Sequence, residues 1–146
     1  MKKKTYTYDY PRPAVSSDIA VLRVGKTAEI LLVRRKNEPF KGMWALPGGF
    51  MEMDETLEEC ARRELEEETG IKAGELLKFD SYDKPGRDPR GRVITQVFVL
   101  IYKEGMGIPK AADDAEALAW FALDALPELG FDHNVIIRDV IGMMKE

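Results

Sequence analysis

The chain has 146 residues and a formal net charge of −4, and 45% of its residues are hydrophobic. This length is typical of one domain that can bury a real core. The acidic balance argues against nonspecific binding to nucleic acid or to a membrane surface, so we expect neither as a partner. No stretch of the sequence is apolar for long enough to span a bilayer.

A cytoplasmic location is expected from the start of the chain and from its one cysteine. Residues 1–4 (MKKK) are basic, but the tyrosines and prolines that follow do not form the apolar region of a signal peptide. Cys60 cannot form an internal disulfide, which fits a reducing compartment. We expect Cys60 to be a small core residue in preference to a reactive thiol.

The N-terminal part of the chain predicts a tail followed by strands. Residues 1–13 are expected to form an extended tail, because Pro11 and Pro13 disfavour a helix. Residues 14–146 are expected to form a single domain. Its first elements are predicted in this order: a strand at 15–24, a strand at 29–34, a loop at 35–43 and a turn at Pro47-Gly48-Gly49.

A helix of about four turns is predicted between Thr56 and Gly70. Thr56 fits the N-cap, and Glu59 three residues later completes a capping box. Gly70 is a natural helix stop. At 100° per residue, the apolar side chains gather in one arc that should face the core: Leu57, Cys60, Ala61 and Leu65.

The C-terminal part of the chain predicts further strands and a second helix. The elements are expected as a strand at 76–82, a polar loop at 83–92, a β-branched strand at 93–102, a loop at 110–117 and a short strand at 118–122. Pro127 is expected to mark a turn, and Asp132 to cap a final helix through Val135, Ile136 and Val140. Strands that bracket two helices predict an α/β fold with a mixed sheet packed between helices.

Three glutamates of the first predicted helix share one face, since Glu64, Glu67 and Glu68 lie three and four residues apart. They continue the apolar arc, and three mutually repelling carboxylates on an inward-leaning face are costly without a cation. Oxygen ligands of this kind suit Mg2+, with Mn2+ as a substitute. The alternative is a solvated acidic face, which is our interpretation of the other glutamates of this helix.

Residues 49–71 read GFMEMDETLEECARRELEEETGI, which is the complete pattern G-x5-E-x7-R-E-U-x-E-E-x-G-U, where U is aliphatic. The chain therefore resembles the Nudix hydrolases, which cleave a nucleoside diphosphate linked to another group with Mg2+ as helper. The resemblance implies the α/β/α sandwich of that family, with a mixed sheet between helices, from about residue 14 onward. Asp54 stands where the family often has glycine.

The resemblance also implies roles for the motif residues. The metal ligands are expected to be Glu64, Glu67, Glu68 and the backbone carbonyl of Gly48 or Gly49. Glu64 is expected as a ligand, as the general base or as both. Arg63 cannot be deprotonated to bind a metal. It is expected to hold Glu55 or one of the metal carboxylates by a charge-assisted hydrogen bond.

Three segments outside the motif look like the ADP-ribose pyrophosphatase-type branch: residues 40–50, residues 85–92, and residues 113–115 with 131–133. The second segment makes a basic patch of Arg87, Arg90 and Arg92 in an otherwise acidic protein. Such a patch can bind the phosphates and the terminal ribose of ADP-ribose by forked hydrogen bonds. The alternative is a solvated hairpin loop shaped by proline and glycine.

Further site candidates lie in the C-terminal part of the chain. One of Asp113, Asp114 and Glu116 is expected to supply an outlying carboxylate that takes a proton from the attacking water or adds a metal ligand. The alternative is a polar loop. His133, the single histidine, either caps the first turn of the last helix or contacts the substrate. Four aromatic residues are candidates for stacking on adenine, and none of them is assigned: Tyr8, Tyr10, Phe40 and Tyr82.

The expected reaction is Mg2+-dependent attack of water on one phosphorus of ADP-ribose, giving AMP and ribose 5-phosphate. Alternatives within the hydrolases are the housecleaning of triphosphates such as 8-oxo-dGTP and the cleavage of NADH or a sugar nucleotide. An alternative of another class is a non-catalytic module that senses ADP-ribose. The unbroken motif favours the enzyme, as does a chain that stops at Glu146 without room for the winged helix of the NAD-linked regulators. A homodimer is left open as the assembly.

Overall fold

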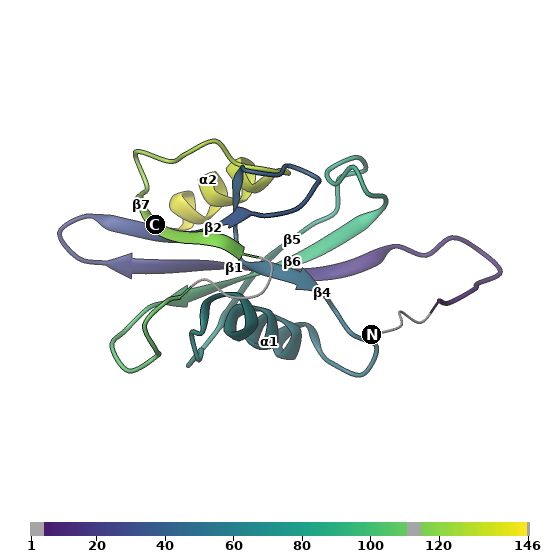
Figure 1. The fold of residues 1–146 in the computed structure, drawn as a ribbon, viewed down its shortest axis with the longest axis horizontal. Helices are drawn as coiled ribbons and strands as arrows, with labels where there is room; N and C mark the ends of the chain where they lie inside the picture. The colour runs from purple at the N-terminus through teal and green to yellow at the C-terminus, as the bar shows by residue number, and fades with distance from the viewer. Residues whose placement is uncertain (1–4, 111–114, 146) are drawn as a thin grey trace.

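The computed structural model describes residues 5–110 and 115–145. A mixed β-sheet lies between two helices, so the predicted α/β/α sandwich is confirmed (Figure 1). The elements are β1 (Ala14–Val24), β2 (Ala28–Arg35), β3 (Trp44–Ala45), β4 (Gly48–Phe50), α1 (Leu57–Thr69), β5 (Leu77–Tyr82), β6 (Val93–Ile101), β7 (Ala115–Ala122) and α2 (His133–Met144).

Strand β1 is the centre of the sheet. It runs parallel to β6, from the pair Ala14↔Val93 to the pair Leu22↔Ile101, and antiparallel to β2 and β4. The order along the sheet is β3-β2-β1-β6-β5, with β7 paired to β2. A strand that is covered by helices on both faces is buried along nearly its whole length. Residues 15–24 therefore show little alternation of polar and apolar side chains.

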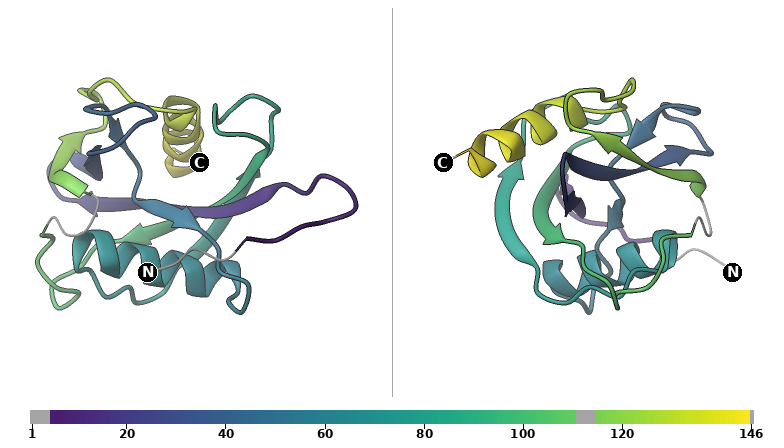
Figure 2. Two further views of the ribbon diagram at one scale, coloured as in Figure 1. Left: turned by 45° about the vertical axis from the view of Figure 1, so that its right-hand side comes forward. Right: turned by 90° about the vertical axis from the view of Figure 1, so that its left-hand side faces the viewer.

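The two helices cover opposite faces of the sheet (Figure 2). Along β1, side chains alternate between the faces: Ile19 packs in the core beneath α1, and Ala20 in the core beneath α2. Helix α1 contributes Leu65 to the first core, and α2 contributes Ile136 to the second. Each helix is therefore held by its own apolar face, as its sequence period predicts.

Helix α1 begins and ends as predicted. The hydroxyl of Thr56 accepts a hydrogen bond from the Glu59 amide at 3.1 Å, and the Glu59 carboxylate accepts one from the Thr56 amide at 2.8 Å. Gly70 closes the helix with a φ of 77°. Cys60 is fully buried, and this burial raises the pKa of its thiol to about 11. The prediction of a core cysteine is confirmed.

The turn predicted at Pro47-Gly48-Gly49 was wrong. Gly48 and Gly49 belong to β4, which pairs with β1 opposite Asp18 and Ser17. A Cβ atom at Gly48 would lie 2.3 Å from Asp18 Oδ1 and 2.3 Å from Ser17 O. Glycine is required here because two strands approach closely, and not because the chain reverses.

The loop predicted at 110–117 was also partly wrong. Residues 111–114 lie outside the described residues, but the backbone is a strand from Ala115 onward. Ala117 pairs with Arg34, and Ala115 pairs with Arg35 after a register shift. Alanine has a weak preference for strands, so pairing with β2, which the local sequence does not reveal, decides this boundary.

Residues 5–13 form no helix or strand, and they run beyond the end of the sheet (Figure 1). Tyr6 and Tyr10 are exposed there, and the guanidinium of Arg12 lies 3.8 Å from the ring centroid of Tyr8. Within the described part of the chain, no helix is long and apolar enough to cross a membrane.

Candidate active site

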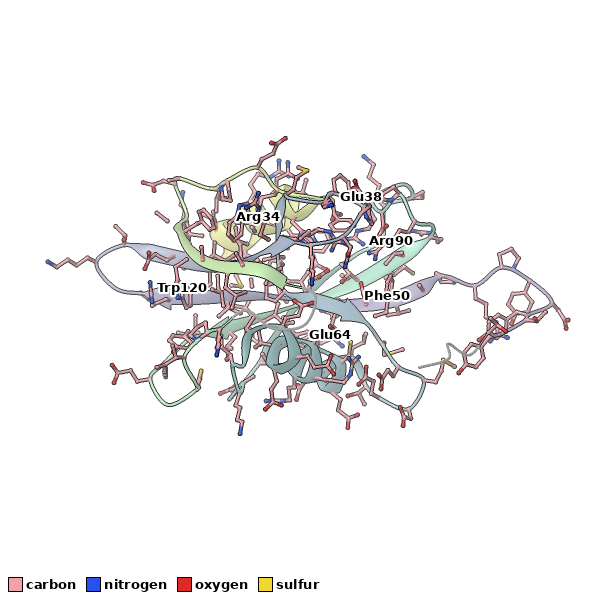
Figure 3. The ribbon with its side chains drawn as sticks, viewed as in Figure 1. Arg34, Glu38, Phe50, Glu64, Arg90 and Trp120 are labelled. Atoms are coloured by element: carbon pink, nitrogen blue, oxygen red, sulfur yellow. The ribbon has the colours of Figure 1, made fainter. Side chains whose placement is uncertain are left out.

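A cavity of about 430 Å³ opens beside β4 and β1. Its walls come from β1, β2, β4, α1, the 83–92 loop and the start of α2. Figure 3 shows Glu64, Phe50 and Arg90 gathered toward the end of the sheet that lies away from Trp120. The cavity thus brings carboxylates of α1 together with arginines of β2 and of the 83–92 loop.

Arg63 connects the carboxylates of the motif. Its Nε and Nη2 atoms donate to the two oxygens of Glu55 at 3.0 and 2.6 Å. Its Nη1 atom donates to Glu64 at 2.8 Å and to Glu67 at 3.3 Å. The hydrogen bonds from Arg63 lower the pKa of Glu55 to about 2, so Glu55 is ionised at neutral pH. Forked, charge-assisted bonds of this kind fix the position of the Glu64 carboxylate.

Glu64 and Glu68 are the carboxylates of α1 that line the cavity. Burial raises the pKa of both, and the charge of Glu64 adds to the effect at Glu68, whose pKa is about 8. The Glu68 carboxylate accepts a hydrogen bond from the Gly48 amide at 3.3 Å. Even with the bond from Arg63 to Glu64, burial and the repulsion between the two carboxylates disfavour their charged forms, and a bound cation would relieve this cost.

Gly49 brings β4 against the carboxylate of Glu64. A Cβ atom at this position would lie 2.3 Å from the Glu64 Cδ atom, so any side chain here would displace the carboxylate. Together, Gly48 and Gly49 place backbone atoms of β4 beside both cavity carboxylates. The close approach of β4 to β1 and to α1 explains why both residues are glycine, whereas the sequence interpretation attributed them to a turn.

The donor set fits a hard divalent cation. Within residues 5–110 and 115–145, no three Asp, Glu, His or Cys side chains come together closely enough to hold an ion by themselves. Mg2+ is usually bound by one or two carboxylates with water and substrate phosphate oxygens, and not by an all-protein cage. Glu64 and Glu68 match that pattern. Glu67 is half exposed, bonds to Arg63 and does not line the cavity.

Arg87 lines the cavity, but its guanidinium is bonded within the protein. Its side chain is 4% exposed, and its Nε and Nη2 atoms donate to the carboxylate of Asp132 at 2.9 and 2.7 Å. Asp132 stands at the N-cap of α2 yet makes no side-chain cap hydrogen bond, so the predicted capping was wrong. The carboxylate is taken up by Arg87, and the pair ties the 83–92 loop to the start of α2.

Arg90 and Arg92 differ in their surroundings. Arg90 lines the cavity, and its Nε and Nη2 atoms donate to the buried carboxylate of Asp88 at 3.1 and 2.8 Å. Burial acts to raise the pKa of Asp88, but the hydrogen bonds from Arg90 outweigh it and lower this pKa. Arg92 is exposed, lies outside the cavity and donates to the backbone of Asp83. The position of Arg92 is the one that the solvated-hairpin alternative describes.

His133 is buried at the start of α2 and lines the cavity. Its Nδ1 atom accepts a hydrogen bond from the Leu46 amide at 2.9 Å. Burial lowers the pKa of the imidazole, so the neutral ring carries its proton on Nε2. That atom lies 3.8 Å from Asp18 Oδ2. The histidine therefore links the residue that follows β3 to the start of α2 and lies near Asp18 of β1, and its side chain does not cap the helix.

Asp18 is a cavity residue that the sequence interpretation missed. It is nearly buried on β1, faces Gly48 across the strand pair, and accepts a hydrogen bond from the Thr95 hydroxyl at 2.7 Å. Its negative charge contributes to the raised pKa of Glu68. A charged residue inside an otherwise apolar strand was the available signal, since a buried carboxylate is rare without a partner or a function.

The predicted outlying carboxylate is only partly located. Asp113 and Asp114 lie outside the described residues. The backbone of Glu116 belongs to β7, so it is in a strand and not in the predicted loop. The structure adds other charged residues to the cavity wall that were not predicted, namely Arg34, Arg35 and Glu38.

The sequence and the fold are similar to those of known proteins. The NUDIX domain family matches residues 13–140. The chain is 48% identical, over 130 residues, to the "ADP-ribose pyrophosphatase" of Methanocaldococcus jannaschii. The match covers 89% of this chain and 74% of that protein.

Two solved structures are similar over most of the chain. The NUDIX domain of Shewanella oneidensis NrtR complexed with ADP ribose is 25% identical, with a TM-score of 0.82 and coverage of 94% of each chain. A bifunctional NMN adenylyltransferase/ADP ribose pyrophosphatase from Francisella tularensis, complexed with AMP and Mn ion, is 32% identical, with a TM-score of 0.77. The match covers 93% of this chain and 43% of that enzyme. The chain therefore belongs to the NUDIX domain family.

Proposed function

We propose that this protein is a metal-dependent pyrophosphatase that hydrolyses ADP-ribose to AMP and ribose 5-phosphate. One observation carries the proposal: the partly buried carboxylates of Glu64 and Glu68 share a single cavity with the guanidinium of Arg90. A diphosphate calls for both kinds of group, because the carboxylates would hold a cation that neutralises its charge while other donors would bind the rest of the molecule. The 48% identical relative named ADP-ribose pyrophosphatase supports the choice of substrate.

The reaction adds water across one P–O bond of the pyrophosphate. The water oxygen bonds to one phosphorus, the bridging oxygen leaves with the other phosphate, and the proton of the water passes to a base. Mg2+, or Mn2+ in its place, would be held by Glu64 and Glu68 with a backbone carbonyl of Gly48 or Gly49. Glu67, which bonds to Arg63 and lies outside the cavity wall, would be the outermost ligand. When bound, such an ion neutralises phosphate charge and lowers the pKa of the water.

The chain's own residues orient these groups. Arg63 holds Glu64 in place through Nη1 while its other nitrogens are fixed by Glu55. We propose Glu64 as a ligand or as the base, in keeping with its position at the cavity. Arg87 acts indirectly, since its bond to Asp132 positions the loop that carries Arg90. Arg90 keeps its guanidinium at the cavity, where its free edge can donate to a phosphate or ribose oxygen.

A sensor without activity is the second candidate, because the NUDIX domain of the NrtR regulator is described in complex with ADP ribose. The network of Arg63 with Glu55, Glu64 and Glu67 favours catalysis, since binding alone does not require it. We further propose a homodimer, with the exposed tyrosines of residues 5–13 as contact groups. Light scattering of the purified protein tests this assembly directly.

Product analysis with Mg2+ tests the activity. The substrates are ADP-ribose, NADH, a UDP-sugar and 8-oxo-dGTP, and the variants are Glu68→Gln and the control Glu66→Gln. Glu66 is exposed on the same helix and lies outside the cavity. We expect AMP and ribose 5-phosphate from ADP-ribose, a loss of orders of magnitude in kcat for Glu68→Gln, and normal turnover for Glu66→Gln. A preference for 8-oxo-dGTP would contradict the proposed substrate.

The arginines supply a second, matched comparison. Arg90→Gln should raise KM for ADP-ribose several-fold, because Arg90 lines the cavity. Arg92→Gln should leave KM unchanged, because Arg92 lies outside it. Equal effects of the two substitutions would mean that the loop binds substrate through its overall charge and not through the placement of Arg90.

A further inference from the structure

The backbone that leads from β3 into β4 is held at three consecutive residues by three different elements. The amide of Leu46 donates to the Nδ1 atom of His133 on α2 at 2.9 Å. The carbonyl of Pro47 accepts a hydrogen bond from the backbone of β1 at 2.9 Å. The amide of Gly48 donates to the Glu68 carboxylate on α1 at 3.3 Å. Since the two helices cover opposite faces of the sheet, this short segment links one helix to the other (Figure 2).

The Leu46 amide depends on the imidazole because it lies between two ladders. Strand β3 ends at Ala45 and pairs with β2, whereas β4 begins at Gly48 and pairs with β1. Leu46 belongs to neither register and is only 3% exposed. A buried amide without a partner is costly. Removal of the imidazole acceptor therefore either leaves this amide unpaired or moves the backbone that continues into β4.

The imidazole of His133 is itself held in place. Trp44 of β3 makes backbone hydrogen bonds of 2.9 and 3.2 Å with the segment that precedes α2. This pairing sets the start of α2 beside β3, so that the ring reaches the residue after the strand. The ring is buried, and its Nε2 atom lies 3.8 Å from the carboxylate of Asp18. The negative charge on that side favours a proton on Nε2, which leaves Nδ1 free to accept.

We propose that His133 is a positioning residue of the metal site, which acts through Leu46 and Gly48 and not through contact with the substrate. The inference rests on the function proposed above, because it places the metal ion between the carboxylates of α1 and the backbone of β4. Gly48 follows Leu46 by two residues, bonds to Glu68 through its amide and offers its carbonyl as a proposed ligand. A shift of about 1 Å at such a group lowers a rate by about a hundred-fold.

Two variants of the same shape separate the acceptor from the bulk of the ring. His133→Asn and His133→Leu branch at the same atom, but asparagine offers an amide oxygen near the position of Nδ1 and leucine offers no acceptor. His133→Leu should lower kcat for ADP-ribose and the affinity for Mn2+ by about 10- to 100-fold each, with little change in KM. His133→Asn should recover most of both losses.

Asn134→Leu is the matched control, because it introduces the same side chain at the next position. Asn134 is exposed in the first turn of α2 and lies outside the cavity. The substitution should leave kcat and the Kd for Mn2+ unchanged. A purely structural role of His133 would lower Tm in both of its variants, while the folded proteins kept normal kcat and normal Mn2+ binding.

Nuclear magnetic resonance of the metal-free protein measures the contact itself. In the wild type, the Leu46 amide nitrogen should show a scalar coupling to Nδ1 of His133, and the amide hydrogen should exchange slowly with solvent. Exchange should become faster by about five-fold or more in His133→Leu and stay slow in His133→Asn. Absence of the coupling in the wild type, or normal kcat and Mn2+ binding in a folded His133→Leu, would overturn the inference.

His133→Asn decides the case in which His133→Leu does not fold. Its kcat should follow the exchange of the Leu46 amide. A protected amide with kcat lowered by about ten-fold, or an unprotected amide with normal kcat, would overturn the positioning role.

The proposed function fails in a different way. A wild-type protein that does not hydrolyse ADP-ribose, but whose Mn2+ binding weakens in His133→Leu and recovers in His133→Asn, would support positioning and reject the activity. Equal hydrolysis of ADP-ribose by the wild type and His133→Leu would do the reverse. A wild-type protein that binds no Mn2+ would overturn both.

Discussion

Arg63 donates two hydrogen bonds to the carboxylate of Glu55, from Nε to Oε2 at 3.0 Å and from Nη2 to Oε1 at 2.6 Å. This forked pair leaves Nη1 to donate to Glu64 at 2.8 Å. Glu55 lies in the segment before α1 and Arg63 within the helix, so the contact anchors the helix to the segment that leads into it. The planar guanidinium makes all three bonds at once, which an ammonium on a flexible stem does not reproduce.

Arg63→Lys is therefore expected to lower kcat for ADP-ribose by about 10- to 100-fold, with a smaller change in KM. The lysine keeps the charge but cannot fork, so Glu64 loses its fixed position. Arg62→Lys is the matched control, because the neighbouring Arg62 binds the Ala73 carbonyl and Glu58 and lies outside the cavity. Steady-state kinetics of both variants measure the change in kcat. Equal decreases in kcat for Arg63→Lys and Arg62→Lys would show that the forked hydrogen bonds of Arg63 have no special role.

Gly49→Ala is expected to lower kcat by about a hundred-fold while the protein still folds, because a displacement of about 1 Å at a reacting group has this scale of effect. The new Cβ atom would lie 2.3 Å from the Glu64 Cδ atom, so the carboxylate must move. The expected companion result is weaker Mn2+ binding, followed by electron paramagnetic resonance.

Gly142→Ala is the control for this substitution. Gly142 lies in α2, and a Cβ atom there would meet nothing within 4 Å. Alanine should raise the free energy of unfolding by about 0.5–1 kcal/mol and leave kcat unchanged. Normal Mn2+ binding by Gly49→Ala would contradict the close contact between β4 and Glu64.

The contribution of Glu68 to the stability of the metal-free protein should fall as the pH rises from about 5 to about 8. Glu68 has a pKa of about 8 in the folded protein because of burial and the charge of Glu64, against an ordinary value of 4.5. At Glu68 the folded state thus binds more protons than the unfolded state across this window, so this contribution to the free energy of unfolding decreases with pH. His133, whose pKa is lowered by burial, contributes in the opposite direction, and the comparison with Glu68→Gln isolates the Glu68 part. The contribution is complete below about pH 4.5 and is lost as the pH rises through about 8.

Thermal melts in EDTA between pH 5 and pH 9 measure this dependence. Glu68→Gln should flatten the profile, since the glutamine does not titrate. Mg2+ should raise Tm most at high pH, because binding to the carboxylate competes with its proton. A wild-type Tm that rises through this window in EDTA, with the same slope in Glu68→Gln, would show that the Glu68 carboxylate is ionised in the folded protein.

Arg87→Ala is expected to lower the free energy of unfolding by about 3 kcal/mol, because it leaves the Asp132 carboxylate without its partner. Urea unfolding followed by fluorescence measures the change. The double variant Arg87→Met/Asp132→Leu should recover a large part of the loss, since an apolar pair carries no desolvation cost. If the double variant loses as much free energy of unfolding as Arg87→Met and Asp132→Leu lose together when made singly, the two residues do not interact in this way.

The local features of the chain were determined by its sequence. The capping box at Thr56, the stop at Gly70 and the buried arc with Cys60 follow from spacings within α1 itself, so they were predicted and confirmed. The same period puts Glu64 and Glu68 on the face that leans into the protein, and the structure places both in the cavity. Helix periodicity and capping act over a few residues, which is why sequence alone predicts them.

The rest of the site was decided by contacts between residues far apart in the chain. Gly48 and Gly49 were read as a turn because the sequence does not show that β4 lies against β1 and α1. Arg87 was expected to belong to a phosphate-binding patch because the sequence does not show that Asp132, 45 residues away, is its partner. Asp18 was missed for the same reason. Sheet pairing and side-chain packing create these neighbours only when the chain folds, so the shape of the cavity belongs to the tertiary structure.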